Sequence, residues 1–270
     1  MTRTILLTGA TDGIGYETAK RLVADGHTVL VHGRSADKLA RTLEALTRIN
    51  AQATVRAYRA DLSSLADVDA LAESVAGDFP VIDVLINNAG VFKTPHTRTT
   101  DGYDVRFVVN TLAPYRLTMK LLAHMPTDGR VVNLSSAAQA PVDVDALLGR
   151  KALSDSAAYA QSKLAITMWS FHLAKVLGPD APAIIAVNPA SLLGSKMVKE
   201  AYGTPGKDIG IGAQILVEAA LDPRFADATG RYFDNDRGQF ASPHPDALDP
   251  QKNQALVALI DDLVAQTADA

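Results

Sequence analysis

Short apolar and β-branched runs alternate with longer helical patterns over the first 190 residues of the chain. Parallel strands that are covered on both faces are apolar almost throughout, and each crossover between two of them takes a helix. The alternation therefore predicts an α/β fold in which helices flank a doubly wound parallel sheet. The predicted strands are residues 4–8, 28–32, 54–58, 81–87, 130–134 and 183–188, and helical patterns occupy 14–25, 36–49, 64–76, 103–124 and 156–177.

The pattern loosens after residue 190. Residues 191–210 contain several Gly and polar breaks, which are typical of a mobile flap that shapes a substrate site. A helix at 208–221, a short strand at 230–233 and a helix at 250–265 are predicted to complete the chain. Because the sequence shows neither an internal repeat nor a shift in composition, we expect residues 1–270 to form a single domain.

Composition and charge exclude several classes of function. The formal net charge is −4 and Lys and Arg are spread along the chain, so a nucleic-acid-binding surface is not expected. The absence of Cys excludes disulfides, thiolate metal sites and cysteine nucleophiles, and the His residues show no metal-ligand spacing. No apolar run approaches the roughly 20 residues of a membrane span. Since the first residues also lack the pattern of a signal peptide, we expect a cytoplasmic protein that does not bind membranes.

A glycine-rich turn joins the first predicted strand directly to the first predicted helix. Its three glycines allow a sharp turn that brings backbone N–H groups close to a pyrophosphate, and the positive end of the helix points to the same place. A turn of this kind alone occurs in many α/β proteins, but its position between strand and helix favours a dinucleotide site. The residues predicted to bind the cofactor here are Gly9, Thr11, Asp12, Gly13, Ile14 and Gly15.

The end of the second predicted strand indicates which dinucleotide is bound. NAD-binding folds place a carboxylate here, which accepts hydrogen bonds from the ribose hydroxyls. This chain has Gly33 followed by Arg34, and its nearest acid is Asp37. A guanidinium pairs with a 2′-phosphate through two hydrogen bonds. Arg34 therefore favours NADP(H) over NAD(H), and a solvated surface arginine is the alternative interpretation.

The spacing GxxxGxG, with Thr8 ahead of it, resembles the first turn of the short-chain dehydrogenase/reductase family. The family's other motifs follow in its order: an Asp after the third strand, NNAG after the fourth, an Asn in a helical pattern, a Ser pair after the fifth strand, and a YxxxK helix. The resemblance covers about residues 4–240 and implies a single-domain Rossmann fold. It also implies further cofactor-binding residues, namely Asp61 and Leu62 near the adenine, Asn88, Ala89 and Gly90 beside the adenine ribose, and Pro189 after the sixth strand.

Tyr159 and Lys163 carry the predicted proton chemistry. Their i, i+4 spacing places both side chains on one face of the helix predicted at 156–177. A free phenol has a pKa of about 10, which is too high for efficient proton transfer at neutral pH. A nearby ammonium favours the phenolate and lowers that pKa. Lys163 is also expected to hydrogen-bond the nicotinamide ribose, so that one residue tunes the acid and aligns the cofactor.

Ser136 and Asn110 complete the predicted catalytic group. Ser136 follows the fifth strand, where its hydroxyl would stabilise charge that develops on the substrate oxygen, and the resemblance favours it over Ser135. Asn110 lies in a helical pattern that Pro114 disturbs. This position is either a kink without a chemical role or, as the resemblance implies, the residue whose backbone carbonyl holds a water molecule in a proton relay.

Two features depart from the commonest family members. Ser136 and Tyr159 are 159 − 136 = 23 residues apart, and the insert at 137–158 is similar to that of retinol-dehydrogenase-like and carbonyl-reductase-like members. After the sixth strand, Ala190 replaces the Gly of a Pro-Gly turn and Gly194 stands where a Thr is common, which leaves side-chain contacts from this loop unassigned. The insert adjoins the helices through which family members pair. Monomer and homodimer both remain open, and the homodimer is slightly favoured.

The sequence thus predicts an NADP(H)-dependent oxidoreductase that acts on CH–OH donors and moves a hydride between the nicotinamide and a ketone, an aldehyde or a secondary alcohol. The alternative is a non-catalytic NADP(H)-binding regulatory protein of the same fold, which would not need the Ser, Tyr and Lys. A sugar-nucleotide epimerase is less expected, because those relatives have TGxxGxxG and longer chains. The residues predicted to line the pocket for a small carbonyl or alcohol substrate are Phe92, His96, Met197 and Tyr202.

Overall fold

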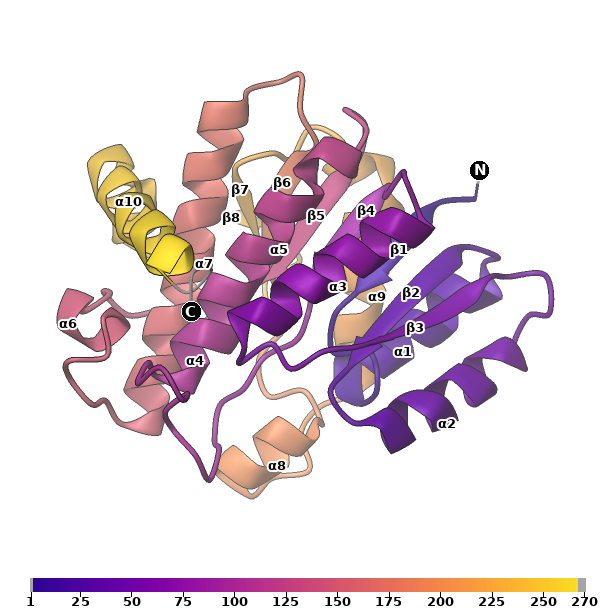
Figure 1. The fold of residues 1–270 in the computed structure, drawn as a ribbon, viewed down its shortest axis with the longest axis horizontal. Coiled ribbons are helices and arrows are strands. Elements are labelled where there is room, and N and C mark those ends of the chain that lie inside the picture. Colours follow the sequence, from indigo (N-terminus) through magenta and orange to yellow (C-terminus); the bar gives the residue numbers. More distant parts are fainter. Residues whose placement is uncertain (1, 267–270) are drawn as a thin grey trace.

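One eight-stranded sheet forms the centre of the molecule (Figure 1). The computed structural model describes residues 2–266, apart from the side chains of residues 200–202. The strand order is β3-β2-β1-β4-β5-β6-β7-β8, and every neighbouring pair is parallel except β7 with β8. The predicted Rossmann-type sheet is therefore confirmed. The strands are β1 (Thr4–Leu7), β2 (Thr28–Gly33), β3 (Val55–Arg59), β4 (Val84–Asn87), β5 (Arg130–Leu134), β6 (Ala183–Asn188), β7 (Arg231–Asp234) and β8 (Gln239–Ala241).

Helices cover both faces of this sheet. The α-helices are α1 (Gly13–Ala24), α2 (Ala36–Thr47), α3 (Leu65–Asp78), α4 (Val105–Phe107), α5 (Ala113–Leu121), α6 (Val144–Leu147), α7 (Asp155–Leu177), α8 (Lys196–Tyr202), α9 (Ile209–Leu221) and α10 (Pro250–Gln266). Helices α1, α2 and α9 share one buried apolar cluster with the sheet, and α3, α5, α7 and α10 share the other. Helix α10 lies alongside α7 at the outside of the second layer (Figure 1).

The central strands are apolar throughout because their side chains alternate between these two layers. In β1, Ile5 and Leu7 belong to the cluster under α1, α2 and α9, whereas Leu6 belongs to the cluster under α3, α5 and α7. All three side chains are fully buried. Burial of one such side chain stabilises a fold by roughly 1.5–3 kcal/mol. A parallel strand that is covered on both faces gains this at every position, which explains the continuous apolar runs.

The strand order reverses at β1. From β1 the chain proceeds outward to β2 and β3, and it then returns to β4 on the other side of β1. The loops after β1 and β4 therefore diverge at the carboxyl ends of their strands and leave a crevice, which is where doubly wound folds bind ligands. The glycine turn follows β1 and the NNAG motif follows β4, so both predicted motifs lie at this crevice.

The helix predicted at 103–124 is interrupted in the structure. Val108–Leu112 form a π-helical segment between α4 and α5, in which the Ala113 N–H donates to the carbonyl five residues back. Pro114 has no N–H, so the carbonyl of Asn110 lacks the donor that an α-helix would supply four residues on. The prediction of one continuous helix is therefore wrong, and the break occurs at the residue with the predicted relay role.

The strand predicted at 81–87 is also shorter than expected, because it pairs only from Val84 onward. Val81 is 53% exposed and so contributes little to the core. The Asp83 carboxylate accepts hydrogen bonds from Arg3 at 2.8 Å and from the Thr4 N–H at 2.7 Å. Residues 81–83 therefore form a loop that leads into β4 and that these polar contacts hold in place.

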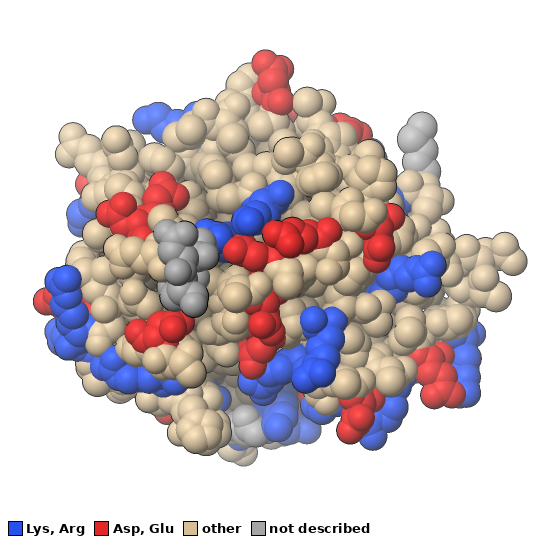
Figure 2. All heavy atoms as spheres, in the orientation of Figure 1, with Lys and Arg blue, Asp and Glu red and all other residues tan. Residues whose placement is uncertain are grey.

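The surface shows no single-sign charge field on the face drawn in Figure 2, where Lys and Arg are interspersed with Asp and Glu. That face offers no continuous basic track for a nucleic-acid backbone. Within residues 2–266, no helix has the length and apolar character needed to cross a membrane. The described part of the chain also contains no group of three or more His, Asp or Glu side chains placed to hold a metal ion.

Candidate active site

The glycine turn after β1 is tightly packed against its neighbours. Gly9 has a φ of +66°, and a Cβ at this residue would lie 2.9 Å from the Cα of Ala89. A Cβ on Gly15 would lie 2.2 Å from the carbonyl oxygen of Gly9. Asp12 caps α1, since its carboxylate accepts a hydrogen bond from the Gly13 N–H at 2.8 Å. The glycines are thus required by close backbone approach between the turn, the first helix and the loop after β4.

His32, near the end of β2, links the glycine turn to the segment after β3 by hydrogen bonds. Its Nδ1 accepts a hydrogen bond from the Gly9 N–H at 3.2 Å, and its Nε2 lies 3.1 Å from the carbonyl oxygen of Ala60. Because Nδ1 accepts, Nε2 carries the proton and donates. Burial lowers the pKa of His32, which favours this neutral ring. Sequence reasoning missed the contact, because both partners are backbone groups of segments far away along the chain.

A cavity of about 550 Å³ runs along the carboxyl ends of the central strands, from the glycine turn to α7. This volume lies within the usual range for a ligand pocket. Every residue predicted to bind the cofactor lines it: Gly9, Thr11, Asp12, Gly13, Ile14, Gly15, Arg34, Asp61, Leu62, Asn88, Ala89, Gly90, Tyr159, Lys163 and Pro189. The fold therefore brings residues from six separate segments of the sequence around one space.

The cavity is also lined by residues of the loop after β4 and by residues at the start of α8. Phe92 and Met197 line it, as predicted for a substrate pocket, and residues 93–95 and 195–196 accompany them. His96, also predicted for the substrate pocket, is not among the residues that line this cavity. The side chain of Tyr202 lies outside the described residues.

Arg34 and Asp61 also line the cavity. Arg34 is exposed to solvent, and its backbone carbonyl accepts a hydrogen bond from Nε of Arg59 at 3.3 Å. The Oδ1 atom of Asp61 accepts from the Ser63 N–H at 3.0 Å and from the Ser63 hydroxyl at 2.7 Å. Asp61 thus stabilises a turn after β3, one of the roles that a residue in this position commonly has, while it also faces the cavity.

Tyr159 and Lys163 lie side by side on the face of α7 that borders the cavity. The Lys163 Nζ lies 5.7 Å from the centre of the Tyr159 ring and donates a hydrogen bond to the carbonyl oxygen of Leu134 at 2.7 Å. Lys163 is only 4% exposed, and burial lowers its pKa to about 8. The ring of Phe92 lies 4.9 Å from that of Tyr159, centre to centre, and forms an apolar wall beside the phenol.

The two serines after β5 have different environments. The hydroxyl of Ser135 is 2.6 Å from that of Thr167 and donates to the carbonyl of Lys163 at 3.1 Å, so it is engaged in the protein interior. The Oγ of Ser136 accepts from the Ala138 N–H at 3.1 Å, a contact that does not use the hydroxyl proton. Ser135 borders the cavity, and Ser136 is not among the described lining residues. The contacts of Ser135 nevertheless leave Ser136 as the better candidate for a donor to substrate.

Asn110 is fully buried and fixes the loop after β4. Its Oδ1 accepts from the Val91 N–H at 2.8 Å, and its Nδ2 donates to the Val91 carbonyl and to the Ser162 hydroxyl, both at 3.0 Å. Its side chain thus joins the π-helical segment to α7 and to the cavity wall. In an α-helix its backbone carbonyl would accept from residue 114, but Pro114 has no N–H to donate.

Comparison with known proteins agrees with this arrangement. A family model described as short chain dehydrogenase matches residues 3–205. The chain belongs to the short-chain dehydrogenase family. Retinol dehydrogenase 13 from Homo sapiens is 30% identical over 275 residues, which cover 95% of this chain and 82% of that protein. This relative confirms the predicted retinol-dehydrogenase-like branch.

Two solved structures of short-chain dehydrogenase fold resemble the chain. An uncharacterized protein from Mycobacterium Paratuberculosis has a TM-score of 0.79 at 28% identity, and the match covers 97% of this chain and 93% of that one. The angucycline C-6 ketoreductase LanV with bound NADP has a TM-score of 0.69 at 25% identity, and the match covers 86% of this chain and 93% of that one. The similarity to the protein from Mycobacterium Paratuberculosis thus extends over nearly the whole chain.

This short-chain dehydrogenase has a strained loop after β6. Ala190, which replaces the glycine common in the family, has a φ of +117°. Such a φ is unfavourable for any residue with a side chain. Asp236 holds the next residue in place, because its carboxylate accepts from the Ser191 N–H at 3.0 Å and also from the Ser191 hydroxyl. The β7–β8 turn therefore fixes the loop despite its strain.

Ser195 supplies a side chain that the sequence analysis left unassigned. It lines the cavity and caps α8, because its hydroxyl accepts from the Val198 N–H at 3.3 Å. The sequence has Gly194 where a Thr is common in the family, with Ser195 next to it, and from the sequence the side-chain contacts of this loop stayed open. Its position directly before a helix is the signal that could have identified Ser195 as an N-cap.

Proposed function

We propose that this short-chain dehydrogenase uses NADP(H) to move a hydride between the nicotinamide and a ketone, an aldehyde or a secondary alcohol. The observation that carries the proposal is the position of buried Lys163 beside Tyr159 in the same cavity that begins at the glycine turn. A buried ammonium costs free energy, so a lysine kept at such a position indicates a function. Here it lies next to a phenol, which is the group that must gain and lose a proton at the substrate oxygen.

The residues of the chain fit the dinucleotide along the whole cavity. Gly13 leaves space that a Cβ would fill, because only Ile209 and Ser195 have atoms within 4 Å of such a Cβ. The first turn of α1 would hold the pyrophosphate, and Lys163 would hold the nicotinamide ribose. When bound, the nicotinamide supplies or accepts the hydride, and every proton step belongs to the protein.

In the reductive direction Tyr159 donates its phenolic proton to the carbonyl oxygen of the substrate. The ammonium of Lys163 stabilises the phenolate that remains, and the Ser136 hydroxyl donates a hydrogen bond to the same substrate oxygen. The phenolate regains its proton from solvent through a water molecule on the Asn110 carbonyl. In the oxidative direction the same steps run backward, with Tyr159 as the base.

NADP(H) is proposed over NAD(H) because Arg34 borders the cavity where an NAD-binding protein has a carboxylate. LanV, a ketoreductase of the same fold, has bound NADP, which supports both the cofactor and the reaction class for this chain. The relatives named as retinol dehydrogenases support an alcohol or aldehyde substrate, with Phe92 and Met197 as apolar walls.

The proposal is tested with purified protein, NADPH or NADH, and a panel of ketones, aldehydes and secondary alcohols followed by the absorbance of the reduced cofactor. We expect turnover with at least one carbonyl, and kcat/KM at least tenfold higher with NADPH, since one lost two-point ion pair costs about 1.5–3 kcal/mol. Binding of NADPH without turnover of any substrate would support the alternative, a non-catalytic regulatory protein.

Substitution of Arg34 tests the cofactor assignment. Arg34→Asp places a carboxylate where the ribose hydroxyls would lie, and it repels a 2′-phosphate. We expect KM for NADPH to rise by tenfold or more while KM for NADH falls. The matched control is Arg41→Asp, which makes the same charge change on the exposed face of α2, outside the cavity lining. Equal effects of the two substitutions would contradict the assignment.

A further inference from the structure

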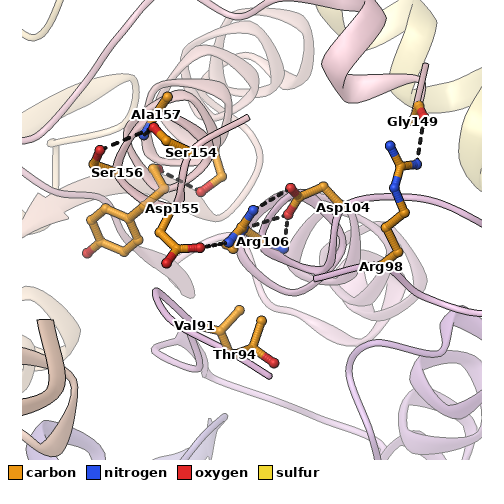
Figure 3. A network of polar contacts seen from close by, with 12 residues as sticks. Val91, Thr94, Arg98, Asp104, Arg106, Gly149, Ser154, Asp155, Ser156 and Ala157 are labelled. Carbon is orange, nitrogen blue, oxygen red and sulfur yellow. Dashed lines mark hydrogen bonds and ion pairs between the residues drawn. The ribbon is translucent and has the colours of Figure 1, made fainter. Parts of the chain in front are cut away.

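A buried arginine joins the two elements that carry Asn110 and Tyr159. Arg106, in α4, is only 1% exposed. Its Nε donates to Oδ1 of Asp104 at 2.7 Å, and its Nη2 donates to Oδ2 of the same carboxylate at 2.6 Å. Its Nη1 donates to Oδ1 of Asp155, the first residue of α7 (Figure 3). The guanidinium thus contacts one carboxylate of its own segment and one that is 49 residues farther along the chain.

Each residue of the Arg106–Asp155 ion pair precedes a residue of the proposed catalytic group by the same number of positions. Arg106 precedes Asn110 by four residues, and Asp155 precedes Tyr159 by four. Four residues are about one helical turn, so each partner of the ion pair lies one turn before a residue of the proposed catalytic group. The ion pair therefore sets the separation of the two helices directly beside the site.

A second set of bonds joins the π-helical segment to α7, about one turn after Arg106 and about two turns after Asp155. The Thr111 hydroxyl donates to the Ser162 carbonyl at 3.0 Å, and Nδ2 of Asn110 donates to the Ser162 hydroxyl at 3.0 Å. Tyr159 lies between the two levels of attachment. The two attachments, one on either side of Tyr159 along the chain, both constrain the orientation of this part of α7.

The contacts around Arg106 also fix the segment of the chain that continues from the cavity wall after β4. Asp104 caps α4, since its carboxylate accepts from the Arg106 N–H at 2.9 Å. Arg98, in the segment that leads from the cavity to this cap, donates to the carbonyl of Gly149 in the insert at 2.7 Å (Figure 3). The segment that supplies Phe92 is thus attached at its far end to α4 and to the insert.

A buried ion pair contributes little net stability, because removal of two charges from water offsets their attraction. Its geometric effect is larger, since a planar guanidinium with two carboxylates permits few arrangements. We infer that Arg106 and Asp155 are positioning residues, which set the placement of Tyr159 relative to Asn110 and the substrate and thereby the rate of the chemical step. This inference rests on the proposed function.

Asp155 is the better end at which to break the pair. Its side chain is 39% exposed, so its loss leaves no void, and Arg106 remains paired with Asp104. Loss of Arg106 would instead leave Asp104 buried and unpaired. Asp155→Ala is expected to lower kcat about tenfold, because small displacements of a reacting group are costly. The dissociation constant for NADPH, measured by fluorescence titration, is expected to stay within twofold. The deuterium isotope effect on kcat with 4-deuterated NADPH is expected to rise.

Two further variants separate positioning from stability. Asp155→Asn keeps an oxygen acceptor for Arg106 and is expected to recover most of kcat. The matched control is Asp69→Ala, which breaks the ion pair of Asp69 with Arg116 between α3 and α5, at 2.7 and 2.6 Å and outside the cavity lining. It is expected to lower the midpoint of thermal unfolding and to leave kcat and the isotope effect unchanged.

The inference is overturned if Asp155→Ala and Asp69→Ala lower kcat equally, or if Asp155→Ala leaves kcat and the isotope effect at their wild-type values. It is also overturned if the loss of kcat is matched by weaker NADPH binding, because the damage then extends to the whole cavity. If the wild-type protein turns over no carbonyl, the proposed function fails and the inference fails with it. Wild-type turnover together with an unaffected Asp155→Ala variant contradicts the inference alone.

Discussion

At the residue scale, Lys163 links function to a cost in stability. The lysine proton has an ordinary pKa of 10.5 in the unfolded chain and a pKa of about 8 in the fold. Below pH 8 both states hold the proton, and the folded state bears the full cost of a buried charge, about 3 kcal/mol. Between pH 8 and 10.5 the fold releases the proton first, so this cost diminishes as the pH rises. Lys163 therefore opposes folding at neutral pH and ceases to do so in alkali.

Lys163→Met tests this linkage. We expect the variant to lose turnover and to gain up to about 3 kcal/mol in the free energy of unfolding at pH 7, with the gain vanishing near pH 10.5. Urea unfolding of both proteins at a series of pH values measures it. The control is Lys175→Met, an exposed lysine on the same helix, which is expected to show no such pH dependence. A constant difference at every pH would contradict the interpretation.

The position and role of some site residues can be predicted from the sequence, and those of others cannot. The glycines, Arg34 and the pair Tyr159 and Lys163 are predictable because their spacing along a strand, turn or helix determines where they lie. His32 and Ser195 are not, because their roles depend on backbone groups that the fold brings near. Ser136 and Asn110 are intermediate, since their neighbours support the predicted roles while their side chains do not line the cavity.

At the element scale, the loop after β6 contains the strained backbone of the site. Ala190 has a φ that costs of order 1–3 kcal/mol for a residue with a side chain. Ala190→Gly removes this strain, at the cost of greater freedom in the unfolded chain. We therefore expect a net gain of about 1 kcal/mol in the free energy of unfolding.

A rise of a few degrees in the midpoint of thermal unfolding would be the measurable sign of relieved strain. Ala181→Gly is the control, because Ala181 precedes β6 in a loop and has no positive φ. That substitution is expected to destabilise the protein slightly through chain entropy alone. If both glycine variants are destabilised to the same degree, Ala190 is not strained in solution.

Elements with a strong, continuous pattern are those that the sequence predicts well. The strands β1, β5 and β6 are buried on both faces, and their apolar runs mark them clearly. The edge strand β8 has three partly exposed residues, and α6 is one turn of helix in the insert, so neither has a periodicity to detect. The π-helical segment depends on hydrogen-bond geometry around Pro114, which no side-chain pattern specifies.

At the scale of the whole molecule, α10 covers the helices through which the family resemblance implies pairing. The Tyr115 hydroxyl of α5 donates to Asp261 at 2.7 Å, and Arg116 donates to the Val264 carbonyl at 2.8 Å. Leu256 and Ile260 of α10 are buried in the same cluster as α7. The chain thus fills with its own C-terminal helix much of the face that a partner would need.

We therefore propose a monomer, contrary to the slight preference for a homodimer that the sequence suggested. Sedimentation equilibrium over a range of concentrations is expected to give a mass near that of one chain, 28.6 kDa. A mass of two chains that persists on dilution would show that α10 does not block association. The sequence could not decide this point, because the contacts of α10 with α5 join residues about 146 positions apart.

We propose that the Tyr159 phenol transfers the proton in a cavity where the rest of the chain holds the dinucleotide. Tyr159→Phe removes one oxygen atom and keeps the ring that contacts Phe92. With a carbonyl substrate of the wild-type protein, we expect kcat to fall by at least 10²-fold, while the dissociation constant for NADPH and the thermal midpoint stay close to wild type. Turnover that is unchanged in Tyr159→Phe would show that another group supplies the proton and would contradict the account.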